Sequence, residues 1–114
     1  METKDADWVR EKIKNAGITQ AELARRSGVS PAHITKVLNG ERGLGEQAII
    51  SIAEALLLSP EVALQETGRL AQSATEDPYV KEASYLIGLL PESQKPIAVD
   101  YIRFLVEKNE ARKK

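Results

Sequence analysis

The stretch of residues 19–40, TQAELARRSGVSPAHITKVLNG, limits the possible folds of this chain more than any other. Thr19 is followed three residues later by Glu22. This capping-box pattern marks a helix start, because each of the two side chains satisfies a free amide there. The helix is expected to end near Ser27, where Gly28 supplies a turn residue that takes positive φ without a Cβ clash. The stretch therefore opens with one short helix and a tight turn.

A second helix is expected directly after this turn. Ser30 is a favourable N-cap, and Pro31 suits the first helical position because its missing N–H has no partner there. The helix should run to Asn39 and stop at Gly40. At about 100° per residue, one side is apolar and the other is mostly polar. The apolar side carries Ile34, Val37 and Leu38, and the opposite side carries Ala32, Thr35, Lys36 and Asn39, with Pro31 and His33 at its edges. Such a helix can lie in a DNA major groove.

Over roughly the first 68 residues, this pattern resembles the helix-turn-helix of the Cro and CI-type phage repressors, also called the xenobiotic-response-element family. The matching residues are Gln20, Ala24, Gly28, Val29, Ile34, Val37, Asn39 and Gly40. The resemblance implies a five-helix lambda-repressor-like DNA-binding domain. The expected fold of the whole chain is all-α, with this domain followed by a two-helix C-terminal dimerisation hairpin. The resemblance also implies that the second helix of the motif is the recognition helix.

The resemblance assigns two sets of DNA contacts. Base edges are expected to meet Pro31, Ala32, His33, Thr35 and Lys36, and phosphates are expected to meet Gln20, Asn39 and Arg42. The family often has glutamines where Pro31 and Ala32 stand, so readout should depend on Lys36, His33 and DNA shape. Two alternatives stay open. Arg42 could be a solvated loop charge, and His33 could be a solvated or internally bonded side chain.

Charge and composition limit the classes of function. The net charge is −1, and residues 1–68 contain eight basic and ten acidic side chains, a balance of 8 − 10 = −2. This balance disfavours a protein that coats DNA indiscriminately but is compatible with a specific reader that has a local basic surface. The basic residues in or near the motif are Arg25, Arg26, Lys36 and Arg42. There is no cysteine for a disulfide or a thiolate metal site. No cofactor is expected. A cytoplasmic location is expected, because the sequence has neither a signal peptide nor an apolar run of membrane-spanning length.

The remaining helices of the first domain can be placed more coarsely. Asp5 or Asp7 is expected to cap a first helix that ends near Ala16, and Trp8 on its apolar stripe is either a core residue, which we favour, or an exposed binding aromatic. A fourth helix is expected over 46–57 and a fifth from Ser59-Pro60 to Gly68. Leu57 stands where the family commonly has a left-handed glycine, so either the helix continues or the turn differs.

The predicted domain boundaries are 1–68 for DNA binding, 69–77 for a linker and 78–114 for a helical dimerisation segment. Asp77-Pro78 should open a sixth helix, and a seventh should run from about 91–93 to about Asn109. The seventh helix is apolar around most of its circumference and should be buried on several sides. The predicted dimer interface consists of Ile97, Tyr101, Ile102, Phe104 and Leu105. The alternative is that these two helices extend a single globular fold.

These features predict a sequence-specific DNA-binding transcriptional regulator, a repressor that binds a pseudo-palindromic operator as a homodimer. Its expected partners are double-stranded DNA, a second copy and, if it is regulated, a further protein, with no membrane. The alternative is an antitoxin-like or other protein-interaction module whose C-terminal helix binds a partner. An enzyme is not expected, because common catalytic motifs are missing. Cyanase has a related N-terminal domain, but residues 69–114 do not resemble its catalytic domain.

Overall fold

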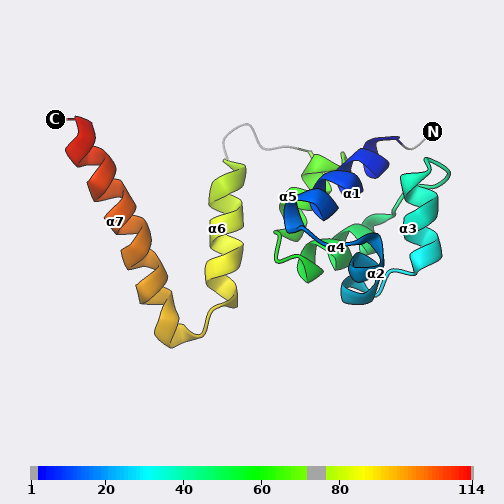
Figure 1. The fold of residues 1–114 in the computed structure, drawn as a ribbon. Coiled ribbons are helices and arrows are strands. Elements are labelled where there is room, and N and C mark those ends of the chain that lie inside the picture. The colour runs from blue at the N-terminus through cyan, green and yellow to red at the C-terminus, as the bar shows by residue number, and fades with distance from the viewer. Residues whose placement is uncertain (1–2, 72–76, 114) are drawn as a thin grey trace.

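The computed structural model describes residues 3–71 and 77–113, and the side chains of residues 4–71 and 77–110 (Figure 1). All secondary structure in these ranges is helical, which confirms the all-α prediction. Five α-helices precede residue 72, and two α-helices with a 3-10 turn between them follow residue 76. In chain order they are α1 (Thr3–Ala16), α2 (Gln20–Ser27), α3 (Pro31–Leu38), α4 (Glu46–Ala55), α5 (Pro60–Glu66), α6 (Pro78–Leu89), the 3-10 turn η1 (Glu92–Gln94) and α7 (Lys95–Lys113).

Four of the predicted N-caps form as expected. The side chains of Thr19, Ser30, Ser59 and Asp77 each accept a backbone N–H from the first turn of α2, α3, α5 and α6. Gly28 ends α2 with φ 77°, as the turn requires. The second half of the predicted capping box is wrong, because the Glu22 carboxylate binds Arg25 and Arg26 of its own helix instead of the helix start.

The core of the first five helices comes from one apolar side of each helix. Its largest fully buried apolar side chains are Val9, Leu23, Ile34, Val37, Ile49 and Ile52. Each such side chain contributes about 1.5–3 kcal/mol when it leaves water. Trp8 belongs to this core as predicted, and its Nε1–H donates to Glu66 Oε1 at 2.9 Å. The core thereby fixes α2 and α3 against the body of the domain.

Three local expectations need correction. Asp5 does not cap α1, because the helix already begins at Thr3 and Asp5 lies buried within it. α4 ends at Ala55, and Leu57 adopts φ 58°, so the turn keeps the left-handed conformation with a leucine in it. α7 begins later than expected, at Lys95, because Glu92–Gln94 form a 3-10 turn, and it extends past Asn109 to Lys113.

α6 contacts the first domain through polar side chains. Lys81 Nζ lies 2.6 Å from Glu61 Oε2, and the Ser59 N–H donates to Glu82 Oε2 at 2.9 Å. From the connection at η1, α6 and α7 diverge (Figure 1). The two helices therefore do not pack along their full lengths as a hairpin would.

The first residue of the predicted linker, Arg69, is bound to α1 through Asp5. Residues 72–76 of that linker lie outside the described residues.

Candidate nucleic-acid interface

The motif places α3 with one side buried and the other outward. Ile34 and Val37 have no exposed surface, so they hold the helix against the core. The outward side consists of exposed residues, namely Pro31, Ala32, Thr35, Lys36 and Asn39. The structure therefore brings together four of the five predicted base-contacting residues on one exposed surface.

Lys36 is the charged member of this surface. Within the described parts of the chain, no ion pair joins Lys36 or Arg42 to an acid. Both cations remain available for an external anion. The same does not hold for Arg25 and Arg26, whose side chains bind Glu22. Their hydrogen bonds lower the pKa of Glu22 to about 2, so that carboxylate stays ionised at neutral pH and offsets part of the basic charge of α2.

Gln20 reaches from the start of α2 to the outward side of α3. Its Nε2 donates to Thr35 Oγ1 at 2.9 Å. Gln20, one of the residues predicted to contact a phosphate, is therefore hydrogen-bonded to Thr35, one of the residues predicted to contact a base. Because the Thr35 oxygen accepts from Gln20, its hydroxyl hydrogen stays available as a donor.

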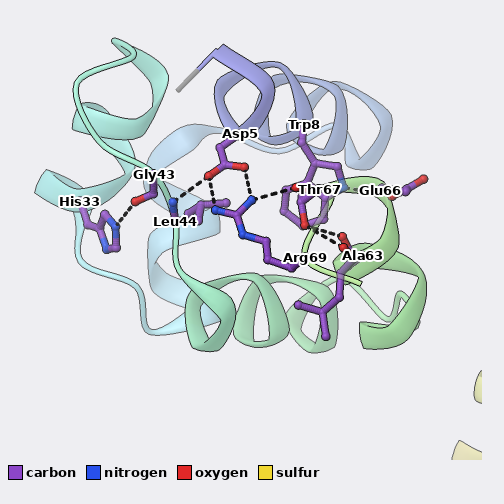
Figure 2. A network of polar contacts seen from close by, with 10 residues as sticks. Asp5, Trp8, His33, Gly43, Leu44, Ala63, Glu66, Thr67 and Arg69 are labelled. Atoms are coloured by element: carbon purple, nitrogen blue, oxygen red, sulfur yellow. Dashed lines mark hydrogen bonds and ion pairs between the residues drawn. The ribbon is translucent and has the colours of Figure 1, made fainter. Parts of the chain in front are cut away.

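His33 differs from the exposed outward residues of α3, because its side chain is bonded within the domain. Its Nε2 is 3.2 Å from the Gly43 carbonyl oxygen, and the residue is half-buried (Figure 2). A carbonyl only accepts, so Nε2 carries the hydrogen. The imidazole is thus bonded to the loop that follows α3, in line with the internally bonded alternative.

The loop of residues 40–45 carries Arg42 and is anchored on both sides of it. On one side, the Glu41 N–H donates to the Lys36 carbonyl at 2.9 Å. On the other side, Leu44 is buried in the core and its N–H donates to Asp5 Oδ2 at 2.9 Å. Arg42 itself is exposed. These anchors hold Arg42 beside the C-terminal end of α3.

Asp5 is the buried charge of this region. Arg69 donates through Nη1 to Asp5 Oδ1 at 2.5 Å and through Nη2 to Asp5 Oδ2 at 2.7 Å. Burial alone would raise the pKa of Asp5, but the hydrogen bonds from Arg69 and from the Leu44 N–H, with the charges of Arg69 and Lys4, together lower it below 3.8. The carboxylate is therefore ionised and fully paired at neutral pH.

Sequence reasoning missed the role of Asp5, although a signal was present. Trp8 and Val9 follow it at three and four residues, so Asp5 falls on the buried stripe of α1. A carboxylate on such a stripe needs a cationic partner. The identity of the partner, 64 residues away, has no comparable local signal. A second missed cation is Arg10, whose Nη2 donates to the Leu38 carbonyl at 2.8 Å and so caps the end of α3.

The five predicted dimer-interface residues lie on α7, and all of them are exposed in the single chain. Every described side chain from Val99 to Glu110 is exposed. α6 contributes further exposed apolar residues, namely Tyr79, Val80, Leu86 and Leu89. α6 and α7, which carry these exposed apolar side chains, lie apart from α3 (Figure 1).

Two features are absent from the described residues. No group of three histidine, cysteine or carboxylate side chains there is arranged to hold a metal ion. Nor does any described helix combine the length and apolar character needed to cross a membrane.

Comparison with known proteins agrees with the geometry of α2 and α3. A helix-turn-helix family profile matches residues 9–62, which span the motif and most of the core. Proteins named uncharacterized HTH-type transcriptional regulators, from two strains of Mycobacterium tuberculosis, are each 32% identical over 104 residues. The alignment covers 91% of this chain and 73% of each relative. No solved structure matches significantly.

Proposed function

Because this chain belongs to the helix-turn-helix transcriptional regulators, we propose that it is a repressor that reads a pseudo-palindromic operator as a homodimer. The observation that carries the proposal is the outward side of α3, where Lys36 is exposed and unpaired while Ile34 and Val37 are fully buried. A rigid helix with a free cation and short neighbours fits the major groove.

Base readout is assigned to the middle of α3. Lys36 donates to guanine O6 or N7, and Thr35 donates through the hydroxyl hydrogen that Gln20 leaves free. The methyl groups of Ala32 and Thr35 face thymine methyls, and Pro31 approaches the same base edges. A base contact by His33 has to use Nδ1, because Nε2 is bonded to the Gly43 carbonyl.

Phosphate contacts are assigned to the ends of the motif. Gln20 stands at the first residue of α2, while Asn39 and Arg42 stand at and just beyond the end of α3. These positions flank the base-reading side chains along the duplex. Phosphate contacts of this kind set register and orientation, whereas the base contacts give specificity.

The exposed apolar surface supports the homodimer. At about 100° per residue, the charged side of α7 is limited to Asp100, Arg103, Glu107 and Glu110, and apolar side chains dominate the rest. α6 has 12 residues and α7 has 19, so a single α6 is too short to cover α7. A second copy of the segment offers the missing apolar area. The two recognition helices would then enter successive major grooves about 34 Å apart.

Selection of bound sequences from a random DNA pool, at stated salt, tests this function. The proposal predicts enrichment of an inverted repeat whose half-sites are separated by about one helical turn. Recovery of no sequence above the starting pool would contradict it. Recovery of a single unrepeated half-site would retain specific binding but contradict the homodimer.

A second candidate function rests on the same exposed helix. If the apolar surface of α7 binds a different protein, the chain is an antitoxin-like interaction module or is regulated by that partner. Sedimentation of the purified chain separates the two. A stable dimer favours self-pairing, whereas a monomer that aggregates favours a missing partner. Both readings describe a non-enzymatic protein that acts in the cytoplasm.

A further inference from the structure

We propose that Asp5 and Arg69 are positioning residues for DNA binding, which hold the loop of residues 40–45 so that Arg42 meets a phosphate. The inference rests on the proposed function, and it assigns to a buried ion pair a task that neither partner performs by touching DNA. One member of that pair, Arg69, follows α5 at the end of the first domain, on the chain segment that leads to α6 and α7.

Three contacts fix the loop that carries Arg42. Between Gly40 and Gly45 the chain is anchored by Glu41 to α3, by Gly43 to His33 and by Leu44 to Asp5. α4 begins after Gly45, which provides no side-chain cap. The carboxylate of Asp5, from a different helix, accepts the Leu44 N–H and so holds the chain directly before α4.

Asp5 is held in turn by Arg69. The two nitrogens of the Arg69 fork each donate to one carboxylate oxygen, and Arg69 Nη1 also donates to the Thr67 carbonyl at 3.1 Å (Figure 2). Thr67 is itself buried, and its hydroxyl donates to the Ala63 carbonyl at 2.9 Å. The carbonyl of Thr67, at the end of α5, thus fixes the position of the Arg69 guanidinium. The guanidinium fixes the position of the Asp5 carboxylate, and the carboxylate holds the loop through the Leu44 N–H.

Removal of Arg69 should change the loop because Asp5 is only 1% exposed. A buried carboxylate without its cation is strongly disfavoured, so it must gain a proton or turn toward water. Protonation weakens its hydrogen bond to the Leu44 N–H, and turning breaks that bond. Either response frees the segment that carries Arg42, although Arg42 is not altered.

The test compares full-length variants for binding to the selected operator. Arg69→Met should weaken binding about tenfold and reduce the slope of log K against log salt by about 1, as expected for one lost phosphate contact. It should also accelerate hydrogen exchange of the Leu44 amide. Lys81→Met is the matched control, because Lys81 ties α6 to Glu61 of α5 without reaching the loop, and it should leave the Leu44 exchange rate and the salt slope unchanged.

A double-mutant cycle separates positioning from general destabilisation. In an Arg42→Ala background, Arg69→Met should have almost no further effect on the affinity, because the contact it disturbs is already absent. If the two effects instead multiply, or if Leu44 exchange is unchanged in Arg69→Met, the inference is wrong. If the methionine variant does not fold, Arg69→Lys replaces it in the test, because lysine keeps the positive charge but not the two-pronged guanidinium. Its loss of operator affinity should be intermediate.

The outcomes distinguish this inference from the proposed function. If the unaltered chain selects no DNA sequence, the proposed function fails. If it selects an operator and Arg69→Met binds that operator equally well while folded, only the positioning role fails.

Discussion

Gln20 Nε2 donates to Thr35 Oγ1 across 2.9 Å, so the first residue of α2 and the outward side of α3 form one polar unit. Both residues are exposed, and Gln20 retains its carbonyl oxygen and a second N–H for other contacts. The bond orients the threonine hydroxyl before any DNA arrives. Phosphate contact and base contact are therefore expected to be coupled.

This coupling is measurable with Gln20→Ala, Thr35→Val and the double variant. Each single change should weaken operator binding, and the double change should cost less than their sum by about 0.5–1.5 kcal/mol, the net value of one hydrogen bond. Titration of each variant with the operator gives the four affinities. Strictly additive losses would show that the two side chains act independently on DNA.

Lys36→Ala should cost about 1–3 kcal/mol of specific binding and relax the preference at one base pair, because a major-groove donor is lost. Lys14→Ala, which removes an exposed lysine near the end of α1, is the comparison for loss of charge alone. Binding constants for the operator and for a scrambled duplex provide the measurement. Equal affinity of Lys36→Ala and the unaltered chain would remove Lys36 from the reading surface.

Stability should fall in acid, and part of the fall should come from Asp5. Its pKa is below the ordinary 3.8 in the folded chain, so its contribution is fully present above pH 3.8 and disappears as the pH drops through the folded value. Urea unfolding at pH 7, 4 and 3 follows this loss. Asp5→Asn should be less stable than the unaltered chain at pH 7, and the difference should shrink toward pH 3. A constant difference would contradict the ionised pair.

Leu57→Gly should stabilise the fold by up to about 1 kcal/mol. Leu57 has φ 58° and is 58% exposed, so glycine relieves a left-handed strain of about 1–2 kcal/mol with little loss of burial, and its greater chain entropy when unfolded offsets part of the gain. Leu57→Ala keeps the strained conformation and should not stabilise. Thermal unfolding of the three chains decides the matter, and a gain in the alanine variant alone would argue against backbone strain.

Phe104→Asp should convert the proposed dimer to monomers. Phe104 is 55% exposed in the single chain, and a carboxylate in a paired apolar surface would be buried without a partner. Sedimentation should show twice the monomer mass of 12.5 kDa for the unaltered chain and the monomer mass for the variant. Arg103→Gln, on the charged side of α7, should remain dimeric. An unchanged mass in Phe104→Asp would place the interface elsewhere.

The local features of the fold were predictable because their causes are local. Thr19, Ser30 and Ser59 cap helices through amides three residues away, and Gly28 adopts the turn conformation that glycine favours. The outward side of α3 follows from helical periodicity alone. The all-α architecture and the family could therefore be predicted from residues 19–40 and their surroundings.

Contacts between distant segments could not be predicted in the same way. The Asp5–Arg69 pair joins residues 64 apart, and the bond from His33 to Gly43 depends on the path of a loop with two glycine ends. The divergence of α6 and α7 also has no sequence signal, since the same apolar pattern suits a closed hairpin or a pair of copies. These features depend on tertiary packing, which residue patterns constrain only weakly.

The central claim is that the outward side of α3 enters the major groove of a specific duplex. Dimethyl sulfate protection on the selected operator tests it directly, because the reagent methylates guanine N7 in that groove. The account predicts protected guanines in two half-sites about one helical turn apart, with protection of one guanine per half-site lost in Lys36→Ala. Saturating protein that leaves every guanine N7 reactive would contradict it.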